Sequence, residues 1–109
     1  MKKSEFCRSI HEIMMDIRLE YKLSQKLMSE NLGVSKKTYI QLEKQRTVLK
    51  WSEAVTLATI FMNSKILQDE FNEDIISVIH GVVFDQKNIQ EINYSIDNVD
   101  VKGDENVDE

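Results

Sequence analysis

The chain has 109 residues, no proline and three glycines, and 41% of its residues are hydrophobic. This length suits one domain with a single core, and the composition favours long helices over a turn-rich sheet protein, so an all-α fold is expected. Cys7 is the single cysteine, which excludes an intramolecular disulfide and favours a reducing compartment such as the cytoplasm.

Charge is distributed unevenly along the chain, whose net charge is −5. Residues 1–50 carry eleven Lys or Arg against six Asp or Glu, whereas residues 51–109 carry three against thirteen. The basic half is compatible with a nucleic-acid partner although the whole chain is acidic. The simpler interpretation of the acidic half is that its charge keeps the protein soluble. The alternative is that it competes with DNA for the basic surface or binds a partner.

Targeting and membrane segments are not expected. Charged and polar residues interrupt the apolar run that a secretion signal needs, namely Glu5, Arg8, His11 and Glu12. The longest apolar stretch, residues 75–84, is about half the length of a membrane span. The expected location is therefore the cytoplasm.

The first two expected helices cover residues 5–22 and 24–32. The first has Met14 at the edge of an apolar stripe formed by Phe6, Ile10, Ile13, Ile17 and Tyr21. The second begins at an N-cap, Ser24, and stops at Gly33, which can adopt a positive φ. Its inward-facing residues are expected to be Leu27, Met28 and Leu32.

Three more helices and one ambiguous segment follow. Residues 35–44 form a helix capped by Ser35, with Tyr39 and Leu42 as the buried pair. A further helix, entered at Ser52 or just before it, ends near residue 63, and its stripe is Trp51, Ala54, Val55, Ala58, Phe61 and Met62. Ser64 opens a short fifth helix. The apolar run 75–84 is either a strand or a buried helix, which periodicity alone does not distinguish.

Residues 23–46 have the pattern of a helix-turn-helix. Gly33 permits the tight turn, Val34 plugs the angle between the two helices, and Ser29 is small enough for them to approach closely. The remaining surface of the second helix can enter a DNA major groove. Glu43 is expected to orient Lys or Arg neighbours within the motif instead of touching DNA.

The expected roles follow from side-chain chemistry. Lys36, Lys37 and Gln41 are candidates for base reading, and the methyl groups of Thr38 and Ile40 for contact with thymine. Gln25 is placed at a helix N-terminus to bind a backbone phosphate, and Lys44 and Arg46 flank the groove. The full candidate set is Gln25, Ser35, Lys36, Lys37, Thr38, Ile40, Gln41, Lys44 and Arg46.

These residues resemble the lambda-repressor-like helix-turn-helix family, the Cro or XRE type of transcriptional regulator. The resemblance covers about residues 6–71 and rests on Leu23-Ser24-Gln25, Leu32-Gly33-Val34-Ser35, Thr38-Tyr39 and Leu42-Glu43, followed by Ala58 and Phe61. It implies a body of five short helices and DNA contacts by Gln25, Lys36, Lys37, Thr38 and Gln41.

The chain departs from the family pattern at three places. Gln45 stands where the family usually has glycine, Leu49 where it often has proline, and Met28-Ser29 replaces a Leu-Ala pair. The loop after the helix over residues 35–44 is therefore expected to differ from that of the family.

The leading hypothesis is a sequence-specific regulator, a repressor, that binds a palindromic operator as a homodimer. Residues 1–72 would be the DNA-binding domain, residues 73–101 an extension whose run 75–84 forms the dimer surface, and residues 102–109 a disordered acidic tail. The alternative is an antitoxin or another protein-interaction module with this fold, whose acidic segment binds a partner protein. No catalytic motif, metal site or cofactor site is expected, because His11 and His80 lack the neighbouring ligands that such sites need.

Overall fold

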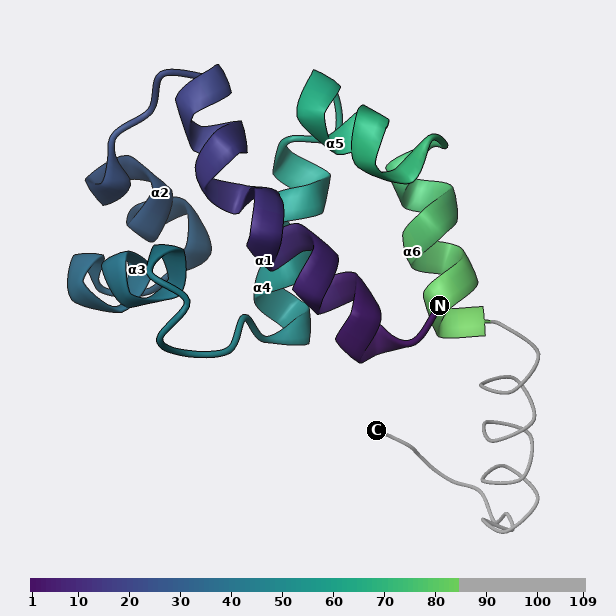
Figure 1. Cartoon of the computed structure of the whole chain (residues 1–109), viewed down its shortest axis with the longest axis horizontal. Helices are drawn as coiled ribbons and strands as arrows, with labels where there is room; N and C mark the ends of the chain where they lie inside the picture. Colours follow the sequence, from purple (N-terminus) through teal and green to yellow (C-terminus); the bar gives the residue numbers. More distant parts are fainter. Residues whose placement is uncertain (85–109) are drawn as a thin grey trace, which may run out of the picture.

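The computed structural model describes residues 1–84, and these residues form helices without any strand. This confirms the all-α prediction for the described part of the chain. The helices are α1 (Lys3–Glu20), α2 (Gln25–Leu32), α3 (Lys36–Glu43), α4 (Trp51–Ile60), α5 (Lys65–Phe71) and α6 (Ile75–Phe84) (Figure 1). Residues 85–101 of the predicted extension and the predicted tail over residues 102–109 lie outside the described residues.

The core is organised around α1, which packs against α3, α4, α5 and α6. Its buried face differs from the predicted stripe, because Met14 is fully buried while Ile13 is only half-buried. Tyr21 was also expected in the stripe, but it follows the last turn of α1 and is 40% exposed, with its ring against Phe61. The residues that α1 buries are Phe6, Ile10, Met14 and Ile17.

The apolar face of α2 is also narrower than predicted. Met28 is buried, Leu32 is half-buried and Leu27 is 41% exposed. Consecutive helical residues lie about 100° apart, so Leu27 and Ser29 flank Met28 on opposite sides. The helix turns the smaller Ser29 inward, at 3% exposure, and Leu27 consequently faces solvent.

Serine side chains begin three of the helices. The Oγ atoms of Ser24, Ser35 and Ser64 each accept a hydrogen bond from the backbone N–H three residues later, at 3.0, 3.0 and 3.1 Å. Each bond satisfies a helix N–H that has no partner within its own helix. The fourth helix begins earlier than Ser52, because Lys50 is its N-cap and donates its N–H to Glu53 Oε1 at 2.9 Å.

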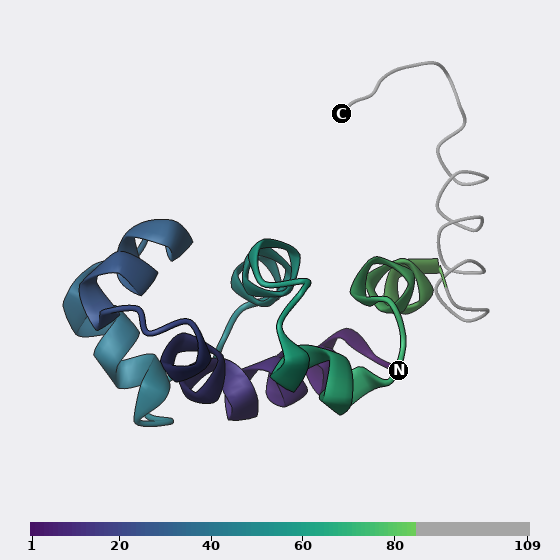
Figure 2. The same ribbon diagram turned by 90° about the horizontal axis from the view of Figure 1, so that it is seen from above.

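The run 75–84 is a helix, which settles the alternative left open by its composition. Figure 2 shows α4 and α6 side by side and nearly end-on, with α1 and α5 along the other side of the molecule. Ile75 and Val82 point into the common core at 3% and 1% exposure, whereas Ile76 and Phe84 are 44% and 46% exposed. Among the described helices, none has the length and apolar character required to cross a bilayer.

Candidate nucleic-acid interface

The turn between α2 and α3 depends on Gly33, whose φ is +71°. Its N–H donates to the carbonyl of Glu30 at 3.2 Å, and the next N–H, that of Val34, donates to the carbonyl of Ser29 at 3.0 Å. This pair of bonds is a Schellman motif, which favours glycine because the left-handed region strains other residues. Val34 is half-buried and packs against the core, as predicted.

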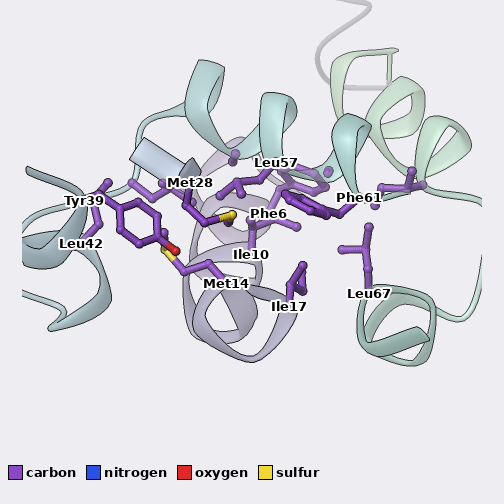
Figure 3. Packing of buried hydrophobic residues seen from close by; sticks show 14 of the residues in the cluster. Phe6, Ile10, Met14, Ile17, Met28, Tyr39, Leu42, Leu57, Phe61 and Leu67 are labelled. Carbon is purple, nitrogen blue, oxygen red and sulfur yellow. The ribbon is translucent and has the colours of Figure 1, made fainter. Parts of the chain in front are cut away.

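The inner face of α3 is anchored firmly. Tyr39 and Leu42 are 0% and 1% exposed, and Figure 3 shows Tyr39 pointing from α3 towards Met14. His11 on α1 donates its Nε2–H to the carbonyl of Leu42 at 2.7 Å, which satisfies one of the last carbonyls of α3. The orientation of α3 around its own axis is therefore fixed by α1.

The outer face of α3 presents most of the candidate residues to solvent. Ser35, Lys36, Lys37 and Thr38 at its N-terminal end are exposed, as are Lys44 and Arg46 beyond its C-terminal end. The two candidates in the middle of the helix, Ile40 and Gln41, are half-buried. The structure thus gathers on one helix and its two ends the candidate residues Ser35, Lys36, Lys37, Thr38, Ile40, Gln41, Lys44 and Arg46.

Ser35 and Thr38 bond to each other at the start of α3. Ser35 Oγ accepts the Thr38 N–H and donates its proton to Thr38 Oγ1, both at 3.0 Å. The Ser35 hydroxyl therefore both accepts and donates a hydrogen bond within the first turn of α3. The bond between the two hydroxyls leaves the hydroxyl proton of Thr38 free to donate to a ligand. Of the two hydroxyls, Thr38 is the better placed to reach a ligand.

The first turn of α3 contains Lys36 and Lys37 and no acid. Cations near a helix N-terminus are repelled by the positive end of the helix dipole, by about 0.3–1 kcal/mol for an exposed charge. Two cations at this position work against helix stability, and such departures from local preference are expected at functional sites. The two lysines and the helix dipole concentrate positive potential at this end of α3.

Gln25 and Glu43 belong to a polar network that also includes Arg18. Arg18 Nε and one of its terminal nitrogens donate to the two oxygens of Glu43, at 2.6 and 3.2 Å, and Gln25 Nε2 donates to Glu43 Oε1 at 3.1 Å. The Arg18 and Glu43 side chains are only 14% and 5% exposed. The network ties α1, α2 and α3 together at one point.

The network changes the ionisation of its members. Burial alone would raise the pKa of Glu43, but the hydrogen bonds from Arg18 and Gln25, together with the positive charge of Arg18, act against burial, and the pKa stays below its ordinary value. Burial raises the pKa of Tyr39, and the neighbouring Glu43 carboxylate adds to the effect. Glu43 is therefore a carboxylate whose charge is balanced by Arg18 inside the protein.

The structure revises two of the expected roles. Glu43 does orient a basic side chain, but that side chain is Arg18 on α1 and not a Lys or Arg of the motif itself. Gln25, expected to reach outward to phosphate, turns one N–H of its amide to Glu43 and is half-buried. Sequence reasoning missed Arg18, because 25 positions separate it from Glu43 and no short-range pattern links the two.

The loop after α3 begins with another Schellman motif, although it lacks glycine. Gln45 has φ +61°, its N–H donates to the carbonyl of Leu42, and the Arg46 N–H donates to the carbonyl of Gln41, both at 3.0 Å. The position where the resembled family usually has glycine thus keeps the left-handed conformation with a glutamine. Arg46 is held at the edge of α3 by this turn.

Among residues 1–84, no group of three or more His, Cys, Asp or Glu side chains is placed to hold a metal ion. Burial raises the pKa of the Cys7 thiol.

Comparisons of the chain with models of protein families, with curated proteins and with solved structures found no match.

Proposed function

We propose that this chain is a sequence-specific DNA-binding transcriptional regulator, a repressor that binds a palindromic operator as a homodimer. In this proposal α1–α5 are a lambda-repressor-like body, and α2 and α3 are its helix-turn-helix. The observation that carries it is the orientation of α3, which buries Tyr39 and Leu42 and leaves Lys36, Lys37 and Thr38 exposed. An α-helix presented in this way fits the width of a major groove.

The candidate side chains on α3 and near its ends have suitable partners on DNA. Lys36 and Lys37 reach guanine acceptors or phosphates, Gln41 pairs with the N6 and N7 atoms of adenine, and the Thr38 methyl group contacts thymine. Lys44 and Arg46 bind phosphates on either side of the groove. Gln25 offers its remaining amide N–H to a phosphate at the N-terminus of α2, in the orientation that Glu43 imposes.

Dimerisation is proposed to occur through the outer face of α6. A single α3 buries too little surface for tight specific binding, so two copies are needed. Ile76 and Phe84 remain 44% and 46% exposed on α6 after its inner face has packed. A second copy related by two-fold symmetry would cover both residues with the same residues of its own helix. To read such an operator, the two α3 helices must enter major grooves that are one helical turn, about 34 Å, or a multiple of that distance apart.

The test is selection of binding sites from a library of random duplex sequences, using the full-length protein. The proposal predicts enrichment of one inverted repeat with half-sites about one helical turn apart. The duplex region upstream of the protein's own gene is a second probe. Enrichment of no sequence, together with weak binding to all duplexes, would overturn the proposal and favour the antitoxin or interaction-module alternative.

A further inference from the structure

A groove of about 800 Å³ lies outside the surface of α3, between the first half of α1 and the loop that joins α3 to α4. Four of its lining residues are exposed cations, and none of the described residues that line it is Asp or Glu. We call it the basic groove and define it by these cations: Lys3, Arg8, Arg46 and Lys50. Lys3 Nζ lies 5.1 Å from the ring centre of Trp51, on the wall of the groove.

We propose that the basic groove binds the sugar–phosphate backbone of DNA beyond the bases that α3 reads, with Lys3 and Arg8 of α1 as its phosphate ligands. This inference rests on the proposed function and extends the interface from α3 to α1. The groove begins where α3 ends, because Arg46 belongs both to the turn after α3 and to the groove lining. In Figure 1 the chain runs from α3 along the lower edge of the molecule to α4.

DNA backbone suits this groove better than a small anion. A duplex presents one negative charge for about each 1.7 Å of its axis, so it can engage several separated cations at once. Lys3 and Arg8 belong to α1, whereas Arg46 and Lys50 belong to the segment between α3 and α4, so a DNA strand in the groove can contact cations of both elements. The competing occupant is the chain's own segment 85–109, which has eight acids and two lysines.

The test compares Lys3→Ala and Arg8→Ala with a control, Lys65→Ala, which removes an exposed lysine from α5, outside the groove. Binding is measured against salt concentration on a duplex of about 40 base pairs that contains the selected sequence, and on one trimmed to about 20 base pairs around its half-sites. Thermal melting and circular dichroism verify that each variant is folded.

The proposal predicts that each groove variant binds the longer duplex about two- to five-fold more weakly, as expected for removal of an exposed ion pair. The slope of log K against log salt should fall by about 0.9 for each phosphate that the variant no longer binds. On the trimmed duplex the variants and the control should differ less. Lys3→Arg, which keeps the charge, should restore binding.

Groove variants that match Lys65→Ala on the longer duplex would overturn the inference while leaving the proposed function intact. Groove variants that bind more tightly than the wild type would overturn it in favour of an acidic peptide, and deletion of residues 85–109 should then have the same effect. If the wild type binds no duplex, both the inference and the proposed function fall.

Discussion

The Glu43 side chain is 5% exposed and accepts hydrogen bonds from two helices other than its own. Removal of one partner from a buried ion pair leaves the other charge unpaired, which is costly. We predict that Glu43→Gln lowers the free energy of unfolding by about 2–3 kcal/mol, since the amide keeps one acceptor but loses the charge. Urea denaturation measures the change, and Glu12→Gln, at an exposed site on α1, should alter stability by less than about 0.5 kcal/mol.

The same carboxylate should make stability depend on pH. Its pKa is lower in the folded protein than its ordinary value of 4.5. Stability from ionised Glu43 is therefore fully present above about pH 4.5 and is lost as the pH falls through the lowered pKa. Glu5 and Glu20 also have lowered pKa values, so the informative quantity is the difference between wild type and Glu43→Gln. That difference should shrink in acid, and a difference that stays constant with pH would contradict the role given to Glu43.

Substitutions of Gln45 test whether the backbone of the loop that follows α3 is strained. An L-residue in the left-handed region costs roughly 1–2 kcal/mol, and glycine avoids that cost but loses more entropy on folding. Because both changes remove the 3.4 Å bond from Gln45 Nε2 to the carbonyl of His11, Gln45→Gly and Gln45→Ala differ only at the backbone and Cβ. Gln45→Gly should be more stable than Gln45→Ala by about 0.5–1 kcal/mol in urea denaturation. Equal stability of the two variants would show that the turn is unstrained.

At the scale of single residues, the sequence predicted the positions whose role is local. Ser24 and Ser35 were predicted as helix caps, and Gly33 as the turn residue, because capping and positive φ depend on neighbours in sequence. Arg18 could not be found in this way, since its partner is on another helix. Gln45 could not be placed in the left-handed region either, because that conformation usually selects glycine or asparagine.

At the scale of whole helices, the proposed dimer interface on the outer face of α6 can be tested. Ile76→Asp would place a charge in the proposed symmetric interface, so it should convert a wild-type dimer to a monomer in sedimentation or light scattering. The monomer should stay folded, because Ile76 is 44% exposed in the single chain. Leu19→Asp is the matched control, since Leu19 is 55% exposed on α1. It should leave the dimer unchanged.

A dimeric Ile76→Asp variant, or a monomeric wild type, would contradict this assignment. Deletion of residues 75–109 is a poorer test, because it removes Ile75 and Val82 from the core.

The sequence located the apolar run 75–84 correctly but left its conformation open. Its inner face is covered by α4 and α5, and that packing depends on tertiary contacts that a short apolar run does not reveal.

At the scale of the whole molecule, the division of charge is the property that sequence revealed most directly. The basic half folds so that cations gather at both ends of α3 and in the basic groove. The uneven distribution of charge made a nucleic-acid partner compatible with the sequence, but it did not predict the groove. Lys3 and Arg8 are on α1, about 40 residues before Arg46 and Lys50, and only the packing of α1 beside the loop brings them together.

The most direct test of the proposed function is a salt-titrated binding measurement with the selected duplex. It compares the wild type with a triple variant, Lys36→Ala, Lys37→Ala and Gln41→Ala, whose fold is verified by circular dichroism and melting. Lys65→Ala with Gln68→Ala on α5 is the control. We predict saturable, sequence-selective binding by the wild type and the control, and no such selectivity in the triple variant. A folded triple variant that keeps both the affinity and the sequence preference would contradict the assignment of α3 as the reading helix.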